Sequence, residues 1–141
     1  MGVYQVYPKK RRRVNPFNMM SVTLSLILIN VILYILVRIL LSVEIISESF
    51  FMNNIAISLE NIEHLRFCTF FTSMFIHGGF FHIFANMFSL FFIGSLIERI
   101  LGRKRYLWFY LISGLFAGIL FILVEFLFPS GLPAVGASGA L

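Results

Sequence analysis

The chain has 141 residues, of which 60% are hydrophobic, 12% are charged and 18 are phenylalanines. A soluble domain uses roughly 45–50% apolar residues, so this composition, with a mean hydropathy of +0.95, excludes a soluble globular protein and indicates a membrane protein. The formal net charge of +5 comes from two basic clusters beside apolar runs, which is typical of membrane orientation signals and argues against nucleic-acid binding.

The first apolar run predicts a membrane span over about 19–41, because no charged residue occurs from Val14 to Val37. About 20 helical residues suffice to cross the hydrocarbon core. The preceding residues 1–18 form a basic tail that contains KKRRR. The positive-inside rule places this tail in the cytoplasm, so the first span should run outward.

Residues 42–79 form a long loop that holds four of the six acidic residues and many Phe, Ile and Leu residues. The acidic bias fits the outer side of the membrane, and the apolar content predicts a segment that lies at the interface or folds back onto the helices. The single cysteine, Cys68, has no partner for an internal disulfide and no metal-ligand spacing. We expect it to be a small buried hydrophobic residue.

Two further spans are predicted over 80–98 and 106–126, separated by the basic turn GRKR, and a fourth starts near Ser138. This order places both basic clusters on one side of the membrane. Gly114 and Gly118 form a small-xxx-small pair, which favours close packing within the protein over a dimer interface. Because only the first turn of the fourth span is present, the chain is expected to be the front part of a longer protein.

Three polar residues are unusual for membrane helices. His82 and Asn86 lie at i and i+4 on one helix face, and Ser138 begins another helix that enters from the same side. We therefore expect all three near the outer face, where a helix N-terminus could supply N–H donors to an oxyanion beside a serine nucleophile. The alternatives are polar side chains that bond neighbouring helices and an ordinary serine N-cap.

The segments TSMFIHGGFFHIFANM (72–87), IERILG (97–102) and GASGA (136–140) resemble rhomboid intramembrane serine proteases in order and separation. The resemblance covers about half of the chain. It implies that Ser138 is the nucleophile and that His82 and Asn86 stabilise the oxyanion together with backbone N–H groups, including that of Ala137. It implies structural roles for four further residues: His77, Glu98, Gly136 and Gly139.

Two departures from the family pattern matter. The Trp-Arg pair that precedes the first family histidine is replaced by Cys68 and Thr69, and Arg66 stands three residues too early. The catalytic histidine of the family's Ser-His dyad belongs to its sixth span, and neither His64 nor His77 is expected to replace it. A serine hydroxyl needs an adjacent base, so residues 1–141 alone are predicted to be inactive.

The resemblance therefore implies an intramembrane serine endopeptidase that cleaves transmembrane segments of membrane proteins within a lipid bilayer. No cofactor and no metal are expected, and the oligomeric state is left open. The alternatives are a non-catalytic rhomboid-like protein that binds membrane clients and a transporter or channel module. The expected location is the plasma membrane, in a multi-pass arrangement with a cytoplasmic N-terminus.

Overall fold

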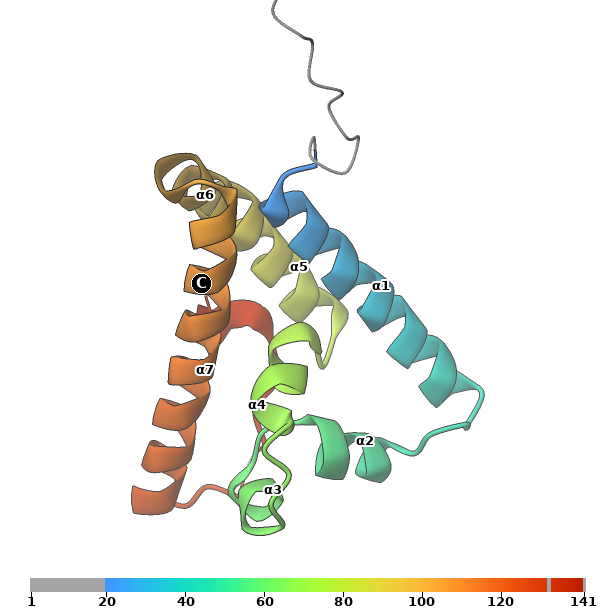
Figure 1. The fold of residues 1–141 in the computed structure, drawn as a ribbon. Coiled ribbons are helices and arrows are strands. Elements are labelled where there is room, and N and C mark those ends of the chain that lie inside the picture. Colours follow the sequence, from blue (N-terminus) through green and yellow to red (C-terminus); the bar gives the residue numbers. More distant parts are fainter. Residues whose placement is uncertain (1–19, 132, 141) are drawn as a thin grey trace, which may run out of the picture.

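A computed structural model of the chain describes residues 20–131 and 133–140. In this part the chain is helical, with one isolated antiparallel bridge and no strand. Three helical rods are long and apolar enough to cross a membrane: Val22–Ser42, Phe80–Leu101 and Arg103–Leu127. They converge at one end and spread apart at the other, where the loop helices lie (Figure 1). The expected all-α membrane bundle is confirmed, and the basic tail lies outside the described residues.

The first rod, α1 (Val22–Ser42), begins where a side chain can satisfy its free N–H groups. The Ser21 hydroxyl accepts a hydrogen bond from the backbone N–H of Leu24 at 3.0 Å, which is the usual geometry of an N-cap. The helix therefore starts slightly later than the span expected over 19–41. Its inward face carries Thr23, Leu26, Asn30 and Val37, all of them buried.

The second rod consists of α5 (Phe80–Ser89), one wider π turn, η3 (Leu90–Gly94), and α6 (Ser95–Leu101). Gly94 lies against the third rod, since a Cβ added there would be 2.4 Å from the hydroxyl oxygen of Tyr106. The same rod also presents an exposed phenylalanine ladder with ring centroids 6.4, 6.2 and 4.8 Å apart, formed by Phe80, Phe84, Phe88 and Phe92. Such a face suits lipid contact.

The loop between the first two rods contains four short helices. They are α2 (Glu48–Ile55), α3 (Leu59–Glu63), α4 (Thr69–Thr72) and the 3-10 turn η2 (Ser73–Phe75). The loop is tied to the segment before Ser138, because Ile57 and Ala134 exchange two backbone hydrogen bonds of 3.0 and 2.8 Å. Cys68 is exposed at the start of α4, so the expectation that it is buried was wrong.

The third rod, α7 (Arg103–Leu127), packs against the 3-10 turn η4 (Ala137–Ala140). Glycines allow this approach, since a Cβ on Gly114 would lie 3.1 Å from the Cβ of Ala140. A Cβ on Gly118 would lie 2.8 Å from the Phe70 ring. The Gly114–Gly118 pair therefore serves close packing inside the protein, as expected. It also admits the serine turn to the middle of α7.

Candidate active site

The serine turn lies against the middle of the third rod. Gly139 faces Ala117, because a Cβ on Gly139 would lie 2.8 Å from the Cβ of Ala117, near the midpoint of α7. The chain leaves α7 at one end and returns to this level before η4 begins (Figure 1). The segment before η4 therefore folds back between the rods, and the position of the site near the outer face stays a prediction.

A cavity of about 390 Å³ brings the three polar residues of the sequence prediction together. Ser138 opens into it from η4, and His82 and Asn86 line it from α5, with Ala85, Ser89 and Ile93. Asn86 is buried, and its Nδ2 donates to the backbone oxygen of His82 at 2.9 Å. An amide nitrogen carries two hydrogens, so this bond fixes the side chain and leaves it a second donor.

Gly136 sets the distance between the serine turn and His82. Its φ of +118° is a conformation that residues with a Cβ rarely adopt. A Cβ at this position would also lie 2.6 Å from Nε2 of His82, closer than any normal contact. The structural role expected for Gly136 therefore has two physical reasons, backbone conformation and the space occupied by the imidazole.

His77 connects the loop to the serine turn. Its ring is 3% exposed, and its Nε2 accepts a hydrogen bond of 3.4 Å from the backbone N–H of Ala137. It meets the His82 ring edge-on, with centroids 5.2 Å apart. Burial, and secondly the neighbouring His82, lower the pKa of His77 to about 4, while the Phe75 backbone acts in the opposite direction. The ring is therefore neutral at pH 7, as an accepting Nε2 requires.

The hydrogen bond to His77 also bears on Ala137. The resemblance assigned the N–H of Ala137 to an oxyanion hole, whereas in this structure it points to an imidazole. An oxyanion could receive this N–H only after that bond breaks. In the described part of the chain no imidazole is hydrogen-bonded to the Ser138 hydroxyl, and no group of three His, Cys, Asp or Glu residues could hold a metal ion.

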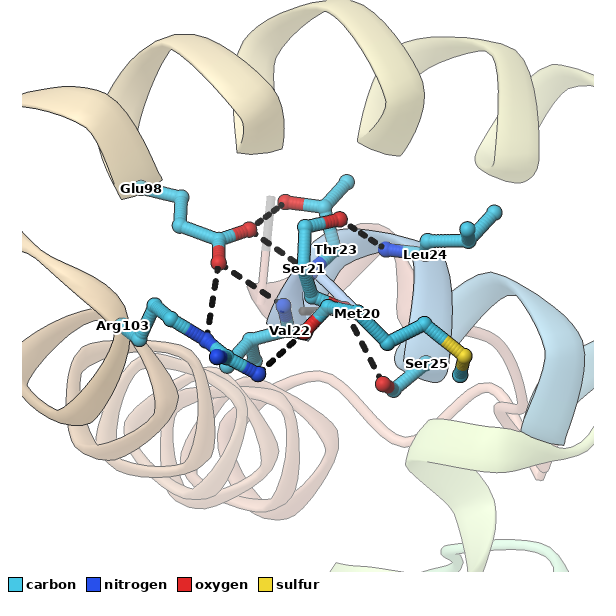
Figure 2. A network of polar contacts seen from close by, with 8 residues as sticks. All are labelled: Met20, Ser21, Val22, Thr23, Leu24, Ser25, Glu98 and Arg103. Atoms are coloured by element: carbon cyan, nitrogen blue, oxygen red, sulfur yellow. Dashed lines mark hydrogen bonds and ion pairs between the residues drawn. The ribbon is translucent and has the colours of Figure 1, made fainter. Parts of the chain in front are cut away.

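Glu98 lies away from this cavity and caps a neighbouring helix (Figure 2). Its carboxylate accepts hydrogen bonds from the N–H groups of Val22 at 2.8 Å and Thr23 at 2.9 Å, and from the Thr23 hydroxyl at 2.7 Å. Arg103 lies 4.0 Å from the same carboxylate and also donates to the Met20 carbonyl. Glu98 thus holds the first turn of α1 against the second rod.

Sequence reasoning missed two polar anchors. The carboxylate of Glu125 accepts bonds from the N–H and hydroxyl of Ser130 and from the N–H of Gly131, at 2.8, 2.7 and 2.6 Å. Its signal in the sequence was an acid followed within six residues by a Pro-Ser-Gly turn. This anchor shapes the start of the segment that returns toward Ser138.

The other anchor is Arg66, whose guanidinium donates to Asn61 Oδ1 at 2.9 Å and to the Asn53 carbonyl. Thr69, one of the two positions that depart from the family pattern, is buried and donates its hydroxyl to the Arg66 carbonyl at 2.7 Å. The loop is thus anchored through Arg66 even though it stands three residues earlier than the family arginine.

Fold and site together define a multi-pass membrane protein with a serine turn held beside a histidine and an asparagine. The sequence model of the rhomboid domain matches residues 64–141, more than half of the chain. The chain belongs to the rhomboid family. It is 33% identical over 136 residues to RHOMBOID-like protein 12, mitochondrial, of Arabidopsis thaliana, an alignment that covers 86% of this chain and 38% of that relative.

Two other relatives match about half of the chain. RHOMBOID-like protein 1 of Arabidopsis thaliana is 46% identical over 71 residues, covering 50% of this chain and 17% of the relative. The protein named "Putative rhomboid protease YdcA" of Bacillus subtilis (strain 168) is 37% identical over 70 residues, covering 50% and 34%. The chain thus spans well under half the length of these relatives. No solved structure matches it significantly.

Proposed function

We propose that this chain carries the nucleophile and the oxyanion-binding residues of an intramembrane serine endopeptidase. The observation that supports this most directly is the cavity shared by Ser138 of η4 with His82 and Asn86 of α5. Membership of the rhomboid family and similarity to a relative named as a protease point the same way. The proposed substrates are transmembrane segments of other membrane proteins.

In the proposed reaction the Ser138 oxygen attacks the carbonyl carbon of a peptide bond, and its proton passes to a general base. The negative charge moves to the carbonyl oxygen, where the second Nδ2 hydrogen of Asn86, a ring N–H of His82 and the N–H of Ser138 would stabilise it. The tetrahedral intermediate collapses, the C–N bond breaks and the amine leaves with the proton. Water then hydrolyses the ester; a cavity of about 390 Å³ has room for it.

The general base is proposed to be an imidazole other than the three histidines of this chain. His77 uses Nε2 to accept from Ala137, and its lowered pKa makes it a weak base. His82 is assigned to the oxyanion, and His64 ends α3 in the loop. Residues 1–141 alone are accordingly expected to have no protease activity, although they contain the nucleophile.

The decisive experiment compares the intact protein, its Ser138→Ala variant and residues 1–141 with a fluorescently labelled transmembrane substrate in proteoliposomes. Cleavage by the intact protein alone is the expected result. Cleavage by the Ser138→Ala variant would move the nucleophile elsewhere. If the intact protein binds the substrate without cutting it, and the variant binds equally well, the chain belongs to a client-binding protein instead.

The proposed orientation places the Glu98 end of the bundle in the cytoplasm, because the basic turn Arg103–Arg105 lies there. A plasma membrane location stays a prediction, and one relative carries the word mitochondrial in its name. Fluorescence microscopy of the tagged intact protein, with protease protection of tags at both ends, distinguishes these membranes and tests the orientation.

A further inference from the structure

Two cavities outside the serine site follow one another along α1. The first, of about 220 Å³, lies between the Ser42 end of α1, α2 and the segment before α5, and its charged lining residues are Arg38 and Glu48. The second, of about 290 Å³, lies between α1 and α5. Its lining consists of apolar side chains and Tyr34. We call the first the polar cavity, for its two charged side chains, and the second the apolar cavity.

Both cavities lie along one seam, defined here as the gap between α1 residues 31–41 and chain residues 77–87, which line them in turn. Val31, Tyr34 and Ile35 line the apolar cavity, and Arg38 lines the polar cavity. Their spacings of three and four residues place these four residues on one face of α1. Across the gap, Gly78 borders the polar cavity and Phe80 borders the apolar cavity.

The polar end of the seam carries two exposed charges of opposite sign. In the described part of the chain neither Arg38 nor Glu48 takes part in an ion pair. Arg38 lies one turn before the end of α1, where an arginine side chain reaches the level of the lipid headgroups. A guanidinium binds phosphate, and a carboxylate at the same cavity favours a ligand that also carries an ammonium group.

We propose that this seam binds one zwitterionic phospholipid of the phosphatidylethanolamine type. Its phosphate would lie at Arg38 and its ammonium group at Glu48. One acyl chain would lie in the apolar cavity beside Tyr34 and Phe84. The size of that cavity favours a chain over a peptide helix, since two turns of a helix 10–12 Å across occupy roughly 1,000 Å³. The proposal does not depend on protease activity.

The test is native mass spectrometry of the full chain in detergent, titrated with palmitoyl-oleoyl phosphatidylethanolamine or with the corresponding anionic phosphatidylglycerol. The unmodified chain is expected to bind one ethanolamine lipid more tightly than the glycerol lipid. Arg38→Gln should weaken binding of both lipids about fivefold, the equivalent of about 1 kcal/mol per charge. Glu48→Gln should weaken the ethanolamine lipid and strengthen the glycerol lipid, each about fivefold.

Matched controls are Arg105→Gln at the other end of the bundle and Glu60→Gln in α3, both exposed residues outside the seam. Neither should change the selectivity. Equal binding of the two lipids by the unmodified chain, or unchanged binding after Arg38→Gln, overturns the proposal. Because Arg38 and Glu48 are exposed, both variants should fold; circular dichroism with thermal melting verifies this.

The apolar cavity of the seam is tested separately. Val31→Trp should fill it and weaken ethanolamine lipid binding at least about tenfold, as expected when several methylene groups lose their burial. Ile32→Trp, on the adjacent exposed face, should bind as the unmodified chain does. Equal lipid binding by both tryptophan variants would contradict an acyl-chain site in the apolar cavity. Displacement of the lipid by an equimolar hydrophobic transmembrane peptide would assign the seam to a helix instead and overturn the proposal.

Discussion

The imidazole of His77 accepts a hydrogen bond from the backbone N–H of Ala137, across 60 positions of sequence. This contact joins the loop between the first two rods to the turn that carries Ser138. The same ring packs edge-on against His82 at a centroid distance of 5.2 Å. Loop, serine turn and α5 therefore meet at one buried ring, and the shape of the candidate site depends on it.

The low pKa of His77 predicts a loss of stability in mild acid. The unfolded chain takes up a proton near pH 6.5, whereas the folded chain does so only near pH 4. Because the unfolded state binds more protons between these values, the free energy of unfolding should fall as the pH drops from 6.5 to 4, by on the order of 2 kcal/mol. Thermal melting in detergent at several pH values measures this.

His77→Asn should flatten that pH dependence, while His64→Asn, an exposed loop variant, should retain it. If the melting temperature changes equally with pH in the unmodified protein and in His77→Asn, the assignment of a buried neutral ring is contradicted.

Gly136→Ala should damage the serine site in two ways. The φ of +118° strains any residue with a Cβ, and the new methyl group would lie 2.6 Å from His82 Nε2. We expect a loss of about 2 kcal/mol in stability. The intact protein should lose at least about a hundredfold in cleavage rate, because small displacements at a catalytic group are costly.

Gly131→Ala is the matched control for Gly136→Ala. Gly131 also has a positive φ, +69°, but a Cβ there meets no atom within 4 Å. This variant should show the conformational cost without the loss of cleavage. Equal cleavage rates for the two alanine variants would show that contact with His82 is unimportant.

Gly139→Ala should push the serine turn away from α7, because its Cβ would lie 2.8 Å from the Cβ of Ala117. Neither atom belongs to a flexible side chain, so relief requires a backbone shift. The expected cost is about 1–3 kcal/mol, with slower cleavage. Adding Ala117→Gly removes the opposing methyl group and should restore both stability and cleavage in the double variant. A double variant as impaired as Gly139→Ala would disprove this contact.

Glu98→Gln should destabilise the bundle and leave the chemistry intact. The carboxylate receives three hydrogen bonds from the first turn of α1, and an amide can match only part of that pattern. We expect a loss of about 1–3 kcal/mol, measured by thermal melting. The folded fraction of the intact Glu98→Gln protein should react normally with a serine-directed fluorophosphonate probe. Glu44→Gln, an exposed loop variant, is the control; a fully folded Glu98→Gln protein that no longer reacts would give Glu98 a catalytic role.

The sequence by itself determined the membrane class, because roughly 20 uncharged apolar residues in a row have few alternatives to a spanning helix. It also placed His82 and Asn86 on one face of α5, since a spacing of four residues fixes that within a helix. The order of the segments around His77, His82, Glu98 and Ser138 was enough to suggest the family. These inferences rest on local periodicity or on residue order.

Tertiary structure decided the level of the serine turn along α7, the partner of the Ala137 N–H and the cap that Glu98 provides for α1. It also decided that Cys68 is exposed and that Arg66 anchors the loop. Each depends on contact between segments whose order along the chain does not set their relative height in the bundle. Close approach at Gly114, Gly136 and Gly139 sets that height, because a Cβ at any of these positions would overlap a neighbouring side chain.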